Sequence, residues 1–383
     1  MSTIARRTIP GMTGGLRDSA ADGLLVIIPA LFTLLVVITA FRDHWVAYDF
    51  QSSYYPAAHR LLDGGSPYAM PAWAIPEGLA FVYPALSAIV FVPFAVLGQA
   101  DADHLYMLIC FLLVPATLWA AGVRDWRVYG LPLLWAPVIL GWKGGNVSVP
   151  LTCLVALAWR YRDRPLVIGL ITALAISLKP FVWPLALWLL VTRRWRAAGY
   201  AFASGLLLNL FAWAIVGFNQ VPTYLRVSGQ VTDALWRWGY GVPALAGHLG
   251  LGRGAGEAML LVASAALVAG VAYVGFARHQ ERNAMILSVA LMLVASPLVW
   301  SHYFVLLLVP LALARPRVGW VWLLPCGMWV CPPSYTATGS EVAVAWLITA
   351  CCLVAALRDA PVGRRSADRR PQQTRPKSLA TTG

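Results

Sequence analysis

Long apolar runs follow one another along most of this chain, and they constrain its fold more than any other feature. The runs cover 23–41, 80–98, 104–122, 128–141, 147–159, 166–178, 181–192, 197–217, 257–277, 284–299, 302–314, 318–331 and 342–357. They are continuous and do not alternate with polar residues, which favours membrane helices over the strands of a barrel. Only 12% of the residues are charged, against about 25% in soluble domains. The sequence therefore predicts an all-α polytopic membrane protein.

Several of these runs are shorter than the ~20 residues that a spanning helix needs. They meet in pairs at polar or proline-containing hinges: 142–146, Lys179-Pro180 and Ser296-Pro297. Irregular backbone at membrane depth is tolerated where it is buried in protein or lines a cavity. If both ends of the chain lie on one side, the number of crossings is even, so we expect about 12 transmembrane helices. The assignment between residues 80 and 141 stays open: either one run there lies along the membrane, or one segment is really two.

The net charge of +13 does not indicate nucleic acid, because the arginines gather in short loops between apolar runs and at the two ends. Such loops face the cytoplasm in membrane proteins. We therefore expect a cytoplasmic tail at 1–22, a membrane domain at 23–357 that starts with an uncleaved anchor, and a disordered basic cytoplasmic tail at 358–383. The hinges and a first loop at 42–79 then lie outside the cell membrane. The six cysteines show no metal-binding spacing, so no cofactor is implied, although a divalent metal stays possible.

The first outer loop carries four of the sixteen acidic residues. Its segment YDFQSSYYPAAHRLLDGGSPY has apolar residues at helical spacing and ends at Gly64-Gly65, which predicts an amphipathic helix at the outer membrane interface. Asp49 stands just before this helix. An aspartate there is commonly an N-cap, so on spacing alone capping and catalysis are both open. A position next to the first membrane helix would let Asp49 reach a lipid-borne headgroup.

Only three lysines occur in the chain, and two of them, Lys143 and Lys179, stand in the outer hinges. A cation flanked by apolar helices is a functional candidate, with an anion such as phosphate as the natural ligand; snorkelling to the interface is the alternative. His302 follows the Pro297 hinge on the same side. Asn146, Asp233 and the outer-loop arginines Arg226 and Arg237 are further candidates.

The order of these motifs resembles that of the actinobacterial polyprenol-phosphate-mannose-dependent α-(1→2)-mannosyltransferases, which are GT-C membrane enzymes of glycosyltransferase family 87. The resemblance extends over about 23–357 and is carried by Asp49-Phe50, Tyr54-Tyr55, Ala57-Ala58, Leu61-Leu62, Gly64-Gly65, Ser66-Pro67-Tyr68, Tyr83-Pro84, Gly144-Gly145-Asn146, Lys179-Pro180 and the segment from Ser296 to His302.

This resemblance implies a GT-C-type bundle and an inverting hexosyltransferase that moves mannose from a polyprenyl-phosphate donor to a cell-envelope glycolipid or glycan. Asp49 matches the aspartate that acts as base on the acceptor hydroxyl. Stabilisation of the leaving phosphate would then fall to the cationic candidates Lys179, His302, Lys143 and Arg237. Substrate contacts are expected from Asn146, Tyr54, Tyr55, Tyr83 and Asp233.

Two alternatives remain at this level. The donor sugar could be arabinose or another sugar. A transporter or lipid-carrier flippase would account equally well for lysines within the membrane, although the polar motifs gather on one side and no acidic relay runs through the apolar runs.

Overall fold

The computed structural model describes residues 12–331 and 337–358, with side chains from residue 22 onward. All regular structure in this part of the chain is helical, which confirms the all-α prediction. The expected tails at 1–11 and 359–383 lie outside the described residues. The first helix, α1, begins at Met12, so residues 12–22 of the expected tail are helical, and the candidate membrane span within α1 begins at Asp22, next to the expected start at 23.

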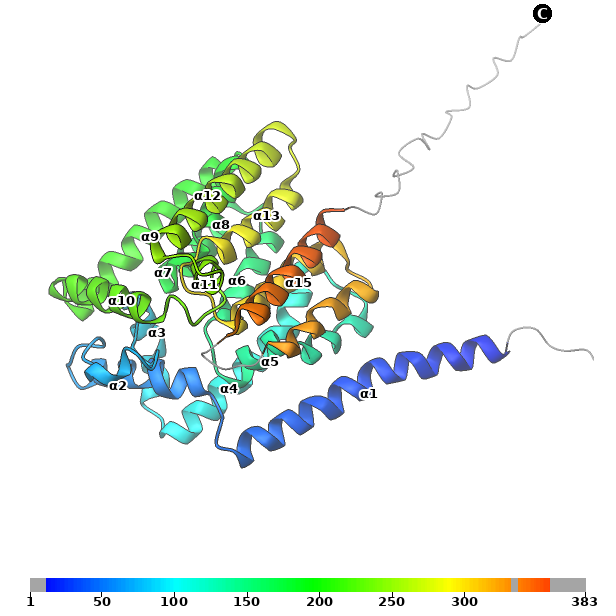
Figure 1. The fold of residues 1–383 in the computed structure, drawn as a ribbon, viewed down its shortest axis with the longest axis horizontal. Helices are drawn as coiled ribbons and strands as arrows, with labels where there is room; N and C mark the ends of the chain where they lie inside the picture. Colours follow the sequence, from blue (N-terminus) through cyan, green and yellow to red (C-terminus); the bar gives the residue numbers. More distant parts are fainter. Residues whose placement is uncertain (1–11, 332–336, 359–383) are drawn as a thin grey trace, which may run out of the picture.

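The helices pack into one bundle from which α1 leans away along its length (Figure 1). Their bounds are α1 Met12–Arg42, α2 Tyr55–Leu62, α3 Ala85–Ala95, α4 Gln99–Ala121, α5 Ala136–Lys143, α6 Ser148–Arg160, α7 Pro165–Leu178, α8 Pro184–Val191, α9 Trp195–Val216, α10 Val221–Leu235, α11 Val242–His248, α12 Arg253–Ala272, α13 Glu281–Val294, α14 Leu308–Ala314 and α15 Gly339–Leu357. Short helical turns connect them: π-helical turns at Phe50–Tyr54 and Tyr273–Ala277, and 3-10 turns at Ala72–Ala74, Trp126–Val128, Leu131–Leu134, Pro180–Val182, Phe218–Gln220, Ser301–Leu307 and Trp320–Val330.

Five helices within the described residues are long and apolar enough to cross a membrane. They are Asp22–Arg42, Gln99–Ala121, Trp195–Val216, Arg253–Ala277 and Gly339–Leu357, and the bent pair α5–α6 makes a sixth if it counts as one span. In the most apolar part of α9 only 6% of the residues are buried, so lipid is the natural environment of its outer surface. The chain is therefore a multi-pass membrane protein.

The expected count of about 12 spans is not shown, because many apolar runs form helices too short to cross alone. The region between 80 and 141 illustrates this. The run 80–98 gives only the 11-residue α3, and the run 128–141 divides into a 3-10 turn and α5. At 1.5 Å per residue, α3 covers about half of a bilayer core. Both ends of the described chain nevertheless leave the bundle on the same side (Figure 1).

The helices break where the sequence dictates. Pro180 disfavours helical geometry for the residue before it, and Lys179 is accordingly extended, with φ −153° and ψ 110°. Helices α5 and α6 meet at a bend of 112°, made possible by Gly145, whose φ of +61° lies in the left-handed region. A third break follows α13 at Ser296–Trp300. These three breaks converge on one end of the bundle.

The Gly145 turn has no room for a side chain. A Cβ built there would lie 3.0 Å from Phe50 Cβ and 3.3 Å from Ala47 Cα. Gly64 also has a positive φ, of +78°, but a Cβ there meets nothing within 4 Å. We therefore expect Gly145→Ala to lower the melting temperature of the purified protein clearly more than Gly64→Ala. The control carries only the backbone strain, roughly 1 kcal/mol. Equal melting temperatures for the two variants would show that the first loop is not packed on this turn.

Candidate active site

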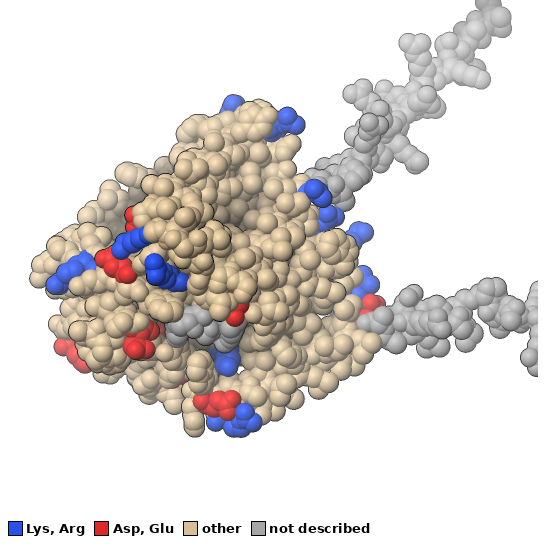
Figure 2. Space-filling view, in the orientation of Figure 1, with Lys and Arg blue, Asp and Glu red and all other residues tan. Residues whose placement is uncertain are grey.

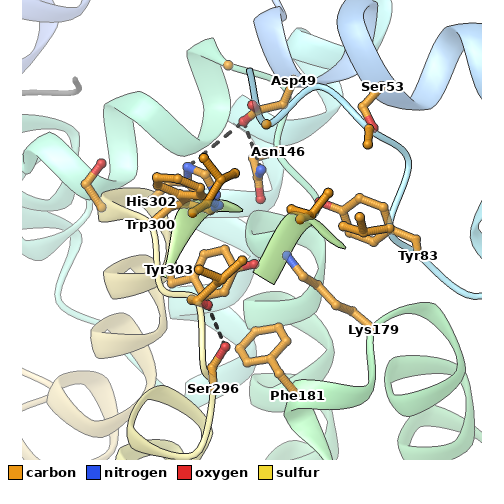
Figure 3. A pocket seen from close by; sticks show the side chains of 18 of the residues that line it. Asp49, Ser53, Tyr83, Asn146, Lys179, Phe181, Ser296, Trp300, His302 and Tyr303 are labelled. Carbon is orange, nitrogen blue, oxygen red and sulfur yellow. Dashed lines mark hydrogen bonds and ion pairs between the residues drawn. The ribbon is translucent and has the colours of Figure 1, made fainter. Parts of the chain in front are cut away.

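A cavity of about 380 Å³ opens where the three helix breaks meet the first loop (Figure 3). Its walls come from segments far apart in the sequence. They are the first loop (Trp45, Tyr48, Asp49, Ser53), the stretch before α3 (Gly78, Ala80, Val82, Tyr83), the α5–α6 turn (Leu140, Lys143, Gly144, Asn146), the α7 break (Lys179, Pro180, Phe181), α10 with Tyr240 (Tyr224, Ser228, Val231, Thr232, Leu235) and the segment 296–303 without Val299.

The backbone of the first loop is bound directly to the turn between α5 and α6. The Ala47 amide donates to the Lys143 carbonyl at 2.8 Å, and the Asp49 amide donates to the Gly144 carbonyl at 2.9 Å. These two bonds fix Asp49 beside the turn. The loop thus belongs to the site through its main chain as well as its side chains.

Asp49 does not act as a helix cap. It precedes the π-helical turn Phe50–Tyr54 but makes no side-chain capping bond. Its Oδ2 instead accepts a hydrogen bond of 2.8 Å from Asn146 Nδ2. Asn146 Oδ1 accepts from the backbone N–H of Ser148 at 2.8 Å and also from the Ser148 hydroxyl, so the Asn146 amide can present only its donor to Asp49. The structure therefore excludes the interpretation of Asp49 as a helix cap.

The second oxygen of Asp49 is available to a substrate. Both side-chain neighbours approach Oδ2: Asn146 at 2.8 Å and His302 Nδ1 at 4.0 Å. Among the described residues, Oδ1 accepts no hydrogen bond, and 26% of the Asp49 side chain is exposed. An ionised carboxylate has capacity for several donors. A hydroxyl entering the cavity can therefore donate to this oxygen.

Burial raises the pKa of Asp49 from its ordinary value to about 6. The hydrogen bond from Asn146 and the positive charge of Lys179 oppose this shift because both favour the ionised form. A carboxylate with a pKa close to the working pH is suited to act as a general base, since it is largely ionised yet still basic.

The Lys179 ammonium stands among three aromatic rings and points into the cavity (Figure 3). Its Nζ lies 4.1 Å from the ring centre of Tyr303, 4.9 Å from that of Tyr83 and 5.3 Å from that of Phe181. In the part of the chain that the structure describes, Nζ has no hydrogen-bond partner although it is buried. The ring faces attract the cation but leave its three donors unused. An anionic ligand would complete this arrangement.

His302 lies beside Asp49 at the start of the 3-10 turn Ser301–Leu307. Its Nδ1 faces Asp49, while its Nε2 is buried without a hydrogen-bond partner among the described residues. Like Lys179, His302 thus carries an unused polar atom beside the cavity.

Two of the three predicted tyrosines, Tyr54 and Tyr83, pack against each other. The hydroxyls of Tyr54 and Tyr83 are 2.8 Å apart, and Tyr83 also lines the cavity. Tyr55 lies elsewhere, with its hydroxyl donating to the Leu97 carbonyl. Of the predicted tyrosines, Tyr83 is therefore placed to touch a ligand, and Tyr54 supports it.

The remaining candidates are less central. Lys143 lines the cavity, with Nζ 5.9 Å from the Trp45 ring. Arg237 does not line it and lies over the Trp236 ring at 4.8 Å. Asp233 points away from the cavity and forms an ion pair of 2.7 Å with Arg253. The proposed donor and substrate contacts of Arg237 and Asp233 thus have no support in this arrangement.

Sequence reasoning missed one whole wall of the cavity. One face of α10, with Tyr224, Ser228, Val231, Thr232 and Leu235, covers it. The spacing of these residues is helical, but the mixture of small polar and apolar side chains carried no specific signal. The rings of Phe181 and Tyr303 around Lys179 were missed as well, although each stands next to a residue that was singled out.

The model of glycosyltransferase family 87 matches residues 81–297. This is more than half of the chain, so the protein belongs to that family and is a glycosyltransferase, acting between a sugar donor and an acceptor. Tyr83, Asn146 and Lys179 fall inside the matched region, whereas Asp49 and His302 lie outside it. No curated protein and no solved structure matches the chain. Among the described residues, no three His, Cys, Asp or Glu side chains are grouped as a metal site.

The contact between Asn146 and Asp49 leads to a pH prediction. If ionised Asp49 is needed for turnover, kcat/KM falls as the pH drops below about 6. In Asn146→Ala the ionised carboxylate of Asp49 loses a hydrogen bond worth about 1.5 kcal/mol or more. The pKa of Asp49 therefore rises, and the acidic limb of the pH profile moves upward by about one pH unit. The measurement is the pH profile of glycosyl transfer, with the exposed Asn219→Ala as control. If the acidic limb of the pH profile stays in place in Asn146→Ala, Asn146 does not influence the ionisation of Asp49.

Proposed function

We propose that this protein transfers a hexose, in the first instance mannose, from a polyprenyl-phosphate donor to a hydroxyl of a cell-envelope glycolipid or glycan. Transfer proceeds with inversion and forms an α-(1→2) link. One observation carries the proposal: an accessible carboxylate and an unpaired ammonium face the same cavity in a membrane-embedded member of glycosyltransferase family 87.

Asp49 is the base in this mechanism. Its Oδ1 takes the proton of the acceptor hydroxyl while the hydroxyl oxygen attacks the anomeric carbon. The bond from that carbon to the phosphate oxygen breaks, and its electron pair leaves with the polyprenyl phosphate. A single displacement inverts the anomeric centre, so an α product requires a β-linked donor. Asn146 holds Oδ2 and thereby turns Oδ1 toward the cavity.

Lys179 stabilises the leaving phosphate. That phosphate is already an anion and gains charge as the bond breaks, so it needs electrostatic stabilisation more than protonation. The unused donors on Lys179 Nζ suit this role, and His302 lines the same cavity beside Asp49. The aromatic rings around Lys179 hold the ammonium in place without competing for its protons.

The active site is proposed to face the outside of the cell membrane. The support is the charge pattern: Arg160, Arg162, Arg164 and Arg196 stand at helix ends remote from the cavity, as expected for cytoplasmic loops. Lys143 would then lie at the outer edge of the cavity.

Replacement of Asp49 is the first test. Asp49→Asn keeps the shape and the Asn146 contact but removes the base, so transfer from polyprenyl-phosphate-mannose is expected to fall by about 10²–10⁴-fold. The matched control is Asp43→Asn in the same loop, where the exposed aspartate is paired with the neighbouring Arg42. The control should keep wild-type activity. Full activity of Asp49→Asn, with an unchanged melting temperature, would remove Asp49 as the base.

Replacement of the two lysines separates their roles. Lys179→Met keeps the packing against the rings and removes the charge, so kcat/KM for the lipid-phosphate donor is expected to fall at least about tenfold. Lys143→Met is expected to cost less, because Lys143 is partly exposed at the rim. Steady-state rates at varied donor concentration measure both. A larger loss of kcat/KM in Lys143→Met than in Lys179→Met would instead place the donor phosphate at Lys143.

A donor screen tests the sugar. Purified protein is supplied with polyprenyl-phosphate-mannose or polyprenyl-phosphate-arabinose in the presence of radiolabelled membranes, and mannose transfer is the expected outcome. Selective transfer of arabinose would replace the donor and leave the roles of Asp49 and Lys179 in place.

A further inference from the structure

A second concave site lies at the other end of the helices, where the turn 315–319 after α14 packs against the C-terminal end of α15. It encloses about 650 Å³ and is lined by Arg315, Arg317 and Arg358. Figure 2 shows Lys and Arg side chains gathered along the right-hand edge of the molecule. The glycosyl-transfer cavity shares no lining residue with this site.

The turn that carries the arginines is fixed in place. Arg315 Nη2 donates to the carbonyls of Ala355 at 3.0 Å and Arg358 at 2.9 Å, and so ties the turn to the end of α15. The indole of Trp322 donates to the Arg315 carbonyl at 2.9 Å. The Val318 amide donates to Asp125 at 3.0 Å. The three guanidinium groups therefore stand on a rigid support.

These arginines have no anionic partner within the described residues. No carboxylate there forms an ion pair with Arg315, Arg317 or Arg358, and Arg315 Nε is buried without a hydrogen-bond partner. Asp125 contacts the 315–319 turn, but its carboxylate is bound to Arg127 and to the Val318 amide. Three cations around one hollow, without a balancing acid, form a site for a phosphate group.

The rest of the hollow is apolar. Trp320, Leu324 and Val354 line it, with 69% of Trp320 and 43% of Val354 exposed. A free phosphate ion gains nothing from contact with this apolar surface. A lipid matches both halves, because its phosphate can lie on the arginines while its chains follow the apolar side chains. An exposed tryptophan beside the cations is also typical of the headgroup level of a membrane.

We propose that this hollow binds the headgroup of an anionic glycerophospholipid, at the end of the bundle opposite the glycosyl-transfer cavity. The phosphate lies against Arg317 and Arg358, and the buried side of Arg315 closes the site. The bound lipid links the 315–319 turn to the end of α15.

The test is a lipid titration of the full-length protein in neutral detergent, followed by native mass spectrometry. Phosphatidylglycerol and phosphatidylcholine with the same acyl chains are compared, with inorganic phosphate as competitor. The variant is Arg317→Gln with Arg358→Gln, which leaves the support from Arg315 intact. The matched control is Arg196→Gln with Arg278→Gln, which removes the same charge from exposed positions at the ends of other helices.

Phosphatidylglycerol is expected to bind the wild type more tightly than phosphatidylcholine. The double variant should weaken phosphatidylglycerol binding at least about tenfold, since each cation at the membrane surface contributes roughly a fivefold factor. The control should change it less than twofold. Equal losses of phosphatidylglycerol binding in the double variant and the control would show that only the overall charge matters, and would overturn the proposed site. Equal binding of the two lipids to the wild type would overturn it as well. Tight binding of inorganic phosphate alone would make it a free-anion site and overturn the lipid assignment.

Discussion

The candidate active site depends on the contact between the first loop and the turn that divides α5 from α6. Two main-chain hydrogen bonds, from Ala47 to Lys143 and from Asp49 to Gly144, join segments about a hundred residues apart. The contact requires Gly145, because no other residue fits its positive φ and the close approach of Phe50. Without it, Asp49 would stand on a free loop, and Asn146 could not reach its carboxylate.

A second constraint is electrostatic. The cavity holds Asp49 and Lys179 in a largely apolar surrounding, and burial acts against the charged form of each. The opposite charges of Asp49 and Lys179 attract each other and offset part of this desolvation cost. The hydrogen bond from Asn146 stabilises Asp49 further, and the aromatic rings stabilise Lys179. They do not form a direct ion pair, so both keep free capacity for ligands. A site built in this way is suited to a reaction in which a proton leaves one side as a negative charge develops on the other.

The sequence was informative about the site because hinge residues are unusual. Lys179 and Asn146 stand out as polar groups between apolar runs, and the structure brings both to the cavity. Asp49 was ambiguous, since the same position suits an N-cap, and only the structure shows that its side chain binds Asn146 and makes no capping bond. Arg237 and Asp233 were equally polar in the sequence but bind Trp236 and Arg253 instead. The direction in which a side chain on or just after α10 points cannot be read from its polarity alone.

The sequence by itself determined that the chain is helical and embedded in a membrane, and it located the hinges, because apolar runs interrupted by Pro180, Gly145 and Pro297 permit little else. Tertiary structure decided how many runs are long enough to span, since α3 and α5 end after a few turns against other helices. It also decided that Asp49 faces Lys179 across a cavity roofed by α10. The reason is that helix breaks mark where the backbone turns, whereas the meeting of distant breaks depends on how the helices pack.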